Sequence, residues 1–339
     1  MKTSVRLLFA ACVAVAATAC DAFHKLSGSP LKASQGAPYE VIVVCEQREW
    51  TGETGEALRN TLTAPIPNLN QTEPHFDVLR VRAQDFTGMI ADHRNILKVV
   101  TDPSLDKITI GARYNVTATP QIVLTLQGPD DRTLAGYLAE NGGKLTELLE
   151  TAERTRDVEF AKKYGVPGIE KAIRQHFGAE MAVPKGYVLA AEQPDFIWAR
   201  YEYPAASQGF FIYSYPYEGP ASLSREALVA ARNKFAARIP GPSDGSYMVT
   251  ADVVDPDYRV YEANGRTWYE LRGFWDVAND YMGGPFVSFS TVDTATGRVF
   301  TLDCYVYSPK LRKRNFLRGV EHLLHTVEFP APDAPGHEA

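Results

Sequence analysis

The stretch GKLTELLETAERTRDVEFAKKYG, residues 143–165, carries its apolar side chains at helical spacing and predicts a long helix. A second predicted helix, VPGIEKAIRQHFG (166–178), follows at once and has Pro167 near its first turn. Beyond it a strand pattern starts again at GYVLAAE (186–192). The two helices therefore divide the chain, and we predict a helical connector over residues 156–180.

Working outward, the residues before this connector resemble those after it. Arg59-Asn60 is followed by Ile66-Pro67, and Arg232-Asn233 is followed at the same distance by Ile239-Pro240. A second set of residues recurs at equal spacing, with Leu145, Leu148, Leu149, Thr151 and Glu153 matching Val320, Leu323, Leu324, Thr326 and Glu328. Such self-similarity predicts two copies of one unit. Chance agreement between common helix residues is the alternative.

The order of the predicted elements indicates the fold class. The first part of the chain has one helix at 51–62 and strand-like runs at 39–46, 76–82, 95–101, 107–114 and 120–129. Strands that come in consecutive groups between helices favour antiparallel sheets. We predict an α+β protein with two similar halves, residues 38–155 and 181–330, each a mainly antiparallel sheet with helices packed on one face.

The N-terminus has the pattern of an export signal. Lys2 and Arg6 precede an apolar stretch that is too short for a comfortable membrane span. It ends in Ala17-Thr18-Ala19-Cys20, which resembles a bacterial lipobox with Ala17 where leucine is usual, and which also fits ordinary signal cleavage. We predict that residues 1–19 are removed and that Cys20 is lipidated.

A small and polar segment follows Cys20, and residues 20–37 are predicted to form a flexible tether. Residues 331–339 are predicted to be a flexible tail. Of the two cysteines in the body, Cys45 and Cys304 can pair in an oxidising compartment or stay two separate buried residues.

Composition narrows the class of protein. The 339 residues are 45% hydrophobic and 22% charged, an ordinary globular mixture. Loss of Lys2 and Arg6 with the signal would leave 33 basic and 41 acidic residues, a net charge of −8. No later run has the roughly 18 apolar residues of a membrane span. We expect a body exported to the periplasm or cell surface, anchored to a membrane by its lipid, and no nucleic-acid partner.

Several runs in order along the chain resemble a known family. They are YEVIVV (39–44), EPHFDV (73–78), HRNIL (93–97), TPQIV (119–123), PKGYVLA (184–190), GPSDGSYM (241–248), YMGGPFVS (281–288) and YVYSPKLRKR (305–314). They are similar to an uncharacterised lipoprotein family of Bacteroidota, domain of unknown function 4837. The resemblance implies an envelope lipoprotein, and it gives no information about an activity.

Motifs of known enzymes match poorly. Ser243 lies in a G-x-S-x-G pattern, but a helix precedes and a strand follows, the reverse of a hydrolase nucleophile. His322 and His325 lie three apart without the H-E-x-x-H arrangement or a third ligand. The glycines of Tyr281–Phe286 favour a packing turn. We predict no metal site and no cofactor, and no catalytic residue is assigned.

Three groups of residues are candidates for binding. Arg94-Asn95 and Arg272 precede apolar strands, where arginine can bind an anionic group or pin the chain through a carboxylate such as Glu73 or Glu270. Alternate residues of one strand, Tyr213, Tyr215 and Tyr217, lie on the same face. This face is either covered by the rest of the protein or forms an exposed aromatic platform that binds glycan or protein. A predicted helix start is surrounded by the basic residues Lys310, Arg312, Lys313 and Arg314. These residues either form a solvated charged face or bind an anionic partner.

The function that these patterns favour is that of a membrane-anchored envelope lipoprotein that binds or scaffolds an envelope protein or glycan. The alternatives are a glycan-processing or other hydrolase, with two carboxylates across a cleft between the halves, and a carrier of small ligands in an apolar pocket. The enzyme question stays open and leans towards a non-enzymatic protein.

Overall fold

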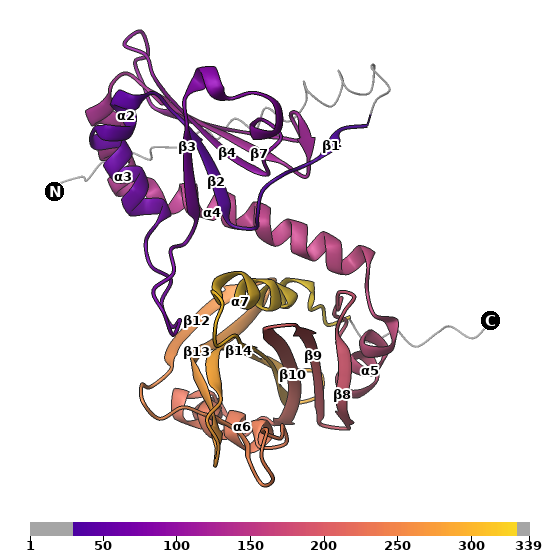
Figure 1. Ribbon diagram of the computed structural model, residues 1–339. Helices are drawn as coiled ribbons and strands as arrows, with labels where there is room; N and C mark the ends of the chain where they lie inside the picture. The colour runs from indigo at the N-terminus through magenta and orange to yellow at the C-terminus, as the bar shows by residue number, and fades with distance from the viewer. Residues whose placement is uncertain (1–29, 331–339) are drawn as a thin grey trace, which may run out of the picture. The chain divides into compact units, whose positions relative to one another are not determined.

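The computed structural model describes residues 30–330, so the predicted signal, Cys20 and the tail lie outside the described residues. The chain divides into two compact units (Figure 1). Unit 1 runs to Ala64 and resumes over Pro74–Glu153, whereas unit 2 comprises Pro65–Glu73 and the chain from Arg154. Both units contain helices and strands, which confirms the α+β class and a two-part architecture. The place of Pro65–Glu73 differs from the expected unbroken half over residues 38–155.

The sheet of unit 1 has five strands in the order β3-β2-β4-β7-β5. Their bounds are β2 Glu40–Val44, β3 Asp77–Val81, β4 Asn95–Thr101, β5 Thr109–Tyr114 and β7 Ile122–Gly128. All neighbours are parallel except β5 and β7. The expectation of a mainly antiparallel sheet is therefore wrong for this unit. Parallel neighbours need a long crossover, and two helices fill the chain between β2 and β3.

Helices cover one face of this sheet, as predicted. The helices are α2 Gln47–Thr51, α3 Glu53–Leu62 and α4 Asp131–Lys163. Leu58 and Leu62 of α3 and Leu145 and Leu149 of α4 are buried against the sheet. Helix α4 begins well before the predicted start at Gly143, because Asp130 accepts hydrogen bonds from the backbone and hydroxyl of Thr133 (both 2.8 Å).

The last part of the predicted tether is ordered on unit 1. Strand β1, Lys32–Ala33, pairs in parallel with β6, Ala118–Thr119. The backbone of Gln35 then accepts from Arg94 N and donates to Asp92 O (both 2.9 Å). The expectation of flexibility up to Ala37 is therefore wrong for these residues, because their backbone groups are satisfied by the folded unit.

Unit 2 is built on one eight-stranded sheet. Its order is β11-β13-β14-β15-β10-β9-β8, with β12 also paired to β13, and every pair is antiparallel. The bounds are β8 Val188–Gln193, β9 Phe196–Tyr203, β10 Ala206–Pro216, β11 Tyr247–Thr250, β12 Asp257–Ala263, β13 Arg266–Ala278, β14 Gly283–Asp293 and β15 Arg298–Tyr307. The antiparallel prediction is confirmed for this unit.

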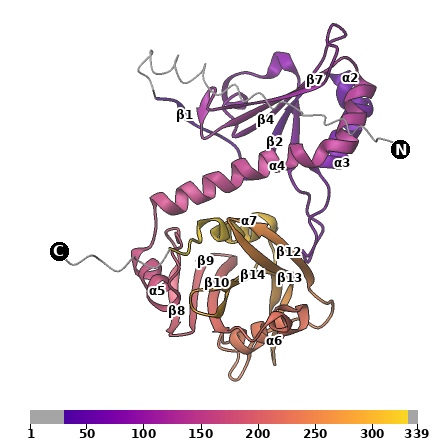
Figure 2. The same cartoon turned by 180° about the vertical axis from the view of Figure 1, so that it is seen from behind.

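Both faces of this sheet are covered, contrary to the prediction of helices on one face. The helices are α5 Pro167–Phe177, α6 Arg225–Ala236 and α7 Arg314–Glu321. Helices α5 and α7 pack on one face, and α6 packs on the other, as Figures 1 and 2 show from opposite sides. The two faces have separate cores because both sets of alternating side chains on β10 and β15 are largely buried.

The predicted internal duplication is not supported, because the two sheets differ in strand direction, number and order. The matched arginines also have different roles. Arg59 donates to the carbonyl oxygen of Trp50 (2.8 Å), whereas Arg232 is fully buried against Asp303 (Nε–Oδ2 2.8 Å). The shared residues therefore reflect two similar helix ends rather than one repeated unit.

The segment Pro65–Glu73 is fixed to unit 2 through a helix cap. Glu73 is only 1% exposed, and its carboxylate accepts the backbone N–H groups of Lys313 (2.6 Å) and Arg314 (3.0 Å). These residues begin α7, where unpaired N–H groups and the helix dipole favour a negative charge. Glu73 thus supplies the anion that the basic helix start needs.

Replacing Glu73 with alanine should lower the free energy of unfolding by about 2 kcal/mol, since hydrogen bonds to a charged group contribute about 1.5–3 kcal/mol. Hydrogen exchange of the Lys313 and Arg314 amides should accelerate, measured beside a urea unfolding curve. Glu147→Ala on the exposed face of α4 is the matched control. Equal exchange rates in the two variants would contradict the capping role.

Candidate functional site

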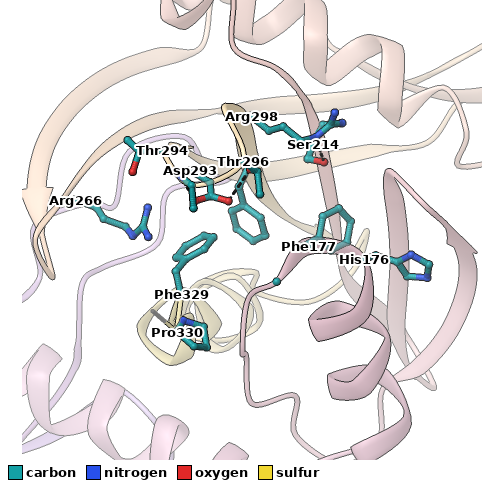
Figure 3. Close-up of a pocket in the computed structure, with 13 residues that line it drawn as sticks. His176, Phe177, Ser214, Arg266, Asp293, Thr294, Thr296, Arg298, Phe329 and Pro330 are labelled. Atoms are coloured by element: carbon teal, nitrogen blue, oxygen red, sulfur yellow. Dashed lines mark hydrogen bonds between the residues drawn. The ribbon is translucent and has the colours of Figure 1, made fainter. Parts of the chain in front are cut away.

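A pocket of about 420 Å³ lies in unit 2 at the end of the sheet face that α5 and α7 cover (Figure 3). Alternation along the strands brings its charged residues to this face. Arg266 lies two positions before the core residue Trp268, and Arg298 two before Phe300. The core thus ends where the strands begin, and polar side chains replace apolar ones at the mouth.

The floor of the pocket is aromatic. Phe177, Phe300 and Phe329 meet edge to face, with ring centroids 6.0 Å apart for the first pair and 5.1 Å for the second. Phe177 ends α5, and Gly178 follows in the left-handed conformation (φ 63°) that closes the helix. Phe329 comes from the chain beyond α7 and is only partly buried.

Two arginines border this floor. The guanidinium of Arg266 lies 4.0 Å from the ring centroid of Phe329, and its Nη1 donates to Val292 O at 3.3 Å. Arg298 donates from Nε to Ser214 Oγ (3.0 Å) and from Nη2 to Ser214 O (2.8 Å). Among residues 30–330, neither guanidinium lies within 4.0 Å of a carboxylate oxygen.

The carboxylates around the pocket are held by other groups. Asp293 is buried, and its two oxygens accept from Ala295 N (3.2 Å) and Thr296 Oγ1 (2.6 Å) within the β14–β15 turn. Asp195 is bound by both terminal nitrogens of Arg238, which lower its pKa most, with a smaller effect of Arg298. At the opposite rim from Arg266, His176 pairs with Glu192 (2.9 Å). The pocket lining therefore carries a net positive charge, although the protein as a whole is acidic.

This arrangement suits binding more than bond cleavage. Among the lining residues that the structure describes, Asp293 is the one carboxylate, and no histidine pairs with a serine. An aromatic floor beside arginines accommodates a ligand with an apolar part and an anionic group.

Arg94 and Asn95 serve to hold unit 1 together. Glu153 of α4 is buried, and it accepts from Arg94 Nη2 (2.8 Å), Asn95 Nδ2 (2.6 Å) and Tyr39 N (3.1 Å). The structure thus supports the carboxylate-pinning role rather than ligand binding. The partner is Glu153, not the Glu73 or Glu270 considered for these arginines.

Arg272 is likewise neutralised within unit 2. Its Nη2 lies 2.6 Å from Glu321 Oε1 and its Nε 3.3 Å from Glu270 Oε1. Burial alone would lower the pKa of Arg272, but the two glutamates outweigh this effect and raise it. Arg272 is a pinning residue, with Glu270 as predicted and Glu321 in addition.

The tyrosine stripe belongs mainly to the core. Tyr213 is 1% exposed and stacks on Phe235 of α6 with ring centroids 4.4 Å apart, so its assignment to an exposed platform is wrong. Burial raises the pKa of Tyr215 to about 12. Tyr217, partly exposed, borders a second pocket next to the first. Tyr213 and Tyr215 belong to the core because α6 covers the face of the sheet on which the tyrosines lie.

The basic stretch divides into two parts. Lys310 and Arg312 are exposed, whereas Lys313 and Arg314 are buried at the α7 cap made by Glu73. The prediction that Lys313 and Arg314 form an exposed site for an external anion is therefore wrong, because the carboxylate of Glu73 occupies the start of the helix.

The remaining motifs have structural roles. Ser243 donates to Asp280 in an exposed loop between α6 and β11, and His322 pairs with Asp157 (2.7 Å). Gly284, the second residue of β14, lies so close to Val306 O that a Cβ would be 2.0 Å from it. Within residues 30–330 no group of three metal-ligating side chains occurs.

Cys45 and Cys304 are two separate buried thiols, one in each unit core, and neither is in a disulfide. Burial raises the pKa of both. This agrees with the alternative of two small buried residues rather than a pair.

None of the predicted binding residues lines the first pocket. A local signal was present, however. Asn264-Gly265-Arg266 and Thr296-Gly297-Arg298 each place an arginine directly after a glycine hairpin turn, with both glycines at positive φ. Asn-Gly predicts a hairpin, but only the fold brings the two turns to one end of a sheet.

Two family models match separate parts of the chain. Residues 167–326 match the domain of unknown function DUF4837, and residues 34–161 match another, DUF8532. The resemblance to domain 4837 is thus confirmed over the second part. The runs quoted at residues 39–123 fall under the other model. A search of curated proteins returned no match.

Similar solved structures include LpqN of Mycobacterium tuberculosis, described as involved in cell envelope biogenesis. It is 15% identical with a TM-score of 0.26, covering 44% of this chain and 82% of LpqN. Another is the lipid transfer and protein localization domain of human StarD13, 10% identical with a TM-score of 0.22, covering 46% of this chain and 95% of that domain. Similarities this low support no statement about fold or function. Among the described residues, no helix combines the length and apolar character needed to cross a membrane.

The Arg272–Glu321 network predicts a pH dependence. Burial alone would raise the pKa of Glu321, but Arg272 and Arg318 outweigh it and hold the pKa at about 2, below the ordinary 4.5. The ionised carboxylate therefore stabilises the fold above pH 4.5, and this contribution is lost as the pH falls towards 2. Unfolding free energy should fall by up to about 3 kcal/mol over this range.

Glu321→Gln should be less stable at neutral pH and should lack this acid-dependent decline in unfolding free energy. The exposed Glu202→Gln, which alters only surface contacts with Arg200 (3.4 Å) and Ser207 Oγ (3.3 Å), should behave as the native protein. Parallel pH profiles for native protein and Glu321→Gln would rule out the assignment.

Proposed function

We propose that the protein is an exported, membrane-anchored lipoprotein and that its second unit binds a small ligand with an apolar part and an anionic group. The anchoring rests on the sequence of residues 1–20, which ends in small residues before Cys20. The body would lie in the periplasm or at the cell surface. A partner in the envelope, protein or glycan, would present or deliver the ligand.

The observation that carries the binding role is the pair Arg266 and Arg298 beside the aromatic floor. Other arginines of this unit form ion pairs with carboxylates, as Arg232 does with Asp303, Arg238 with Asp195 and Arg272 with Glu321. Arg266 and Arg298 instead border a pocket, and neither has a carboxylate partner within residues 30–330. Each can offer a planar fork of donors, which suits carboxylate or phosphate.

A non-enzymatic role is the reading we favour for this pocket. General acid–base hydrolysis of a glycoside needs two carboxyl groups in reach of one bond. Among the described lining residues Asp293 alone is acidic, and its oxygens are held by the turn. The hydrolase hypothesis concerned a site elsewhere, between the halves, and no observation on the described residues favours it.

The anchoring is tested by Cys20→Ser. In the native cell, the unaltered protein should be recovered in the membrane fraction and should incorporate labelled fatty acid. The variant should lose the label and move to the soluble fraction of the envelope, because the lipid is the proposed attachment. A variant that keeps the label would disprove lipidation at Cys20.

The pocket is tested with phenyl phosphate, whose ring and anion match the floor and the arginines. Titration should show saturable binding to the native protein. Arg298→Gln should weaken it at least tenfold, about 1.4 kcal/mol, because a charge-assisted contact is removed. Arg200→Gln, on an exposed position of β9, is the matched control and should bind as the native protein.

Thermal unfolding of each variant checks that the fold is retained. Absence of saturable binding to the native protein, or equal binding by Arg298→Gln and Arg200→Gln, would overturn the proposed site.

A further inference from the structure

A second pocket, of about 550 Å³, adjoins the first in unit 2. The two share three lining residues, Arg266, Thr294 and Phe329. Figure 3 shows these three on the same side of the first pocket, away from His176. Arg266 and its stacked ring Phe329 therefore form the boundary between the two pockets, and a ligand group at this boundary is within reach of both.

The second pocket differs in chemistry from the first. Its lining contains no acidic residue, and Arg266 is its one charged side chain among the described residues. Tyrosine and threonine hydroxyls dominate instead, from Tyr217, Thr267, Tyr269, Thr291 and Thr294. A hydroxyl-rich lining suits a ligand that itself carries many hydroxyl groups.

Three of these hydroxyls are unused within the part of the chain that the structure describes. Thr291 Oγ1 donates to Thr267 O (2.9 Å), and Thr267 Oγ1 donates to Glu262. By contrast, the hydroxyls of Tyr217, Tyr269 and Thr294 have no hydrogen-bond partner within residues 30–330. Each can donate and accept, so three hydroxyls around this pocket are available to a ligand.

Arg266 also has donors to spare. Its one hydrogen bond within the described chain is the 3.3 Å contact from Nη1 to Val292 O, out of five N–H donors on a guanidinium. Stacking on Phe329 fixes the plane of the guanidinium. A fixed plane with unused donors is suited to bidentate recognition of a carboxylate or phosphate.

Together these features match an acidic sugar chain. Sugar hydroxyls can pair with the free tyrosine and threonine hydroxyls, and the C–H face of a sugar ring can pack on an aromatic ring. An acidic substituent can bind Arg266. Two adjoining pockets, each within or near the size range of ligand sites, fit successive residues of one chain.

We propose that the two pockets are neighbouring subsites of one groove that binds an acidic oligosaccharide, with its anionic group on Arg266. The inference rests on the binding role proposed above and adds the class of ligand. The anion is either a uronate carboxylate or a phosphate ester, since both fit the same guanidinium.

The test uses isothermal titration with four probes: trigalacturonic acid, its methyl ester, mannose 6-phosphate and neutral maltotriose. Trigalacturonic acid or mannose 6-phosphate should bind saturably, and which of them binds identifies the source of the anion. The methyl ester and maltotriose should bind at least tenfold more weakly, because they lack the charge.

Variants locate the binding on the two pockets. Arg266→Gln should weaken binding of the preferred acidic probe at least tenfold, whereas the Arg200→Gln control should not. The double variant Tyr217→Phe, Tyr269→Phe should weaken the acidic sugar several-fold more than it weakens phenyl phosphate, because phenyl phosphate needs only the first pocket. Loss of fold is monitored by thermal unfolding.

The outcomes separate this inference from the function on which it rests. Binding of phenyl phosphate without binding of either acidic sugar would overturn the oligosaccharide inference and leave the binding role standing. Failure of all probes, phenyl phosphate included, would overturn both. Equal binding of the acidic trisaccharide and its methyl ester would exclude Arg266 as the anion site.

Discussion

The eight-stranded sheet of unit 2 is buried on both faces, and this constraint decides where charged side chains on its central strands can lie. In the middle of β15, Asp303 is fully buried, and it is matched by Arg232 of α6 across two contacts of 2.8 and 3.2 Å. The Arg232 guanidinium also lies 3.6 Å from the ring centroid of Phe286. A charge buried there without a partner would cost several kcal/mol.

At the strand ends the same constraint is relaxed. Arg266 and Arg298 begin β13 and β15, where α5 stops at Phe177 and the core opens. Their aliphatic stems can lie along aromatic rings while the guanidinium groups stay accessible. The pocket is thus a consequence of how the core ends: aromatic below, positively charged at the rim, and hydroxyl-rich where the β12–β13 hairpin meets Tyr217.

Local patterns predicted most elements but not their arrangement. The apolar runs of β2, β4 and β7 and the helical spacing of α3 and α5 were readable, because each depends on neighbouring residues. Strand direction in unit 1 depends on which strands pair across a crossover, so VIVV was compatible with either sheet type. Tyr213 and Arg94 looked like binding residues because their partners, Phe235 and Glu153, lie far away in sequence. Arg266 and Arg298 escaped notice for the same reason: what distinguishes them is the lack of a carboxylate partner within the described chain, which only the fold reveals.

The central claim is that Arg266 and Arg298 are kept accessible to hold an anion over an aromatic floor. The most direct measurement is a crystal structure of the protein soaked with 4-bromophenyl phosphate, in which the anomalous signal of bromine locates the ring independently of any assumption about the site. The account predicts bromine within the pocket lined by Phe177, Phe300 and Phe329, with phosphate oxygens in hydrogen-bond range of Arg266 or Arg298. Ordered bromine at another place on the protein, or an empty pocket at saturating ligand, would contradict it.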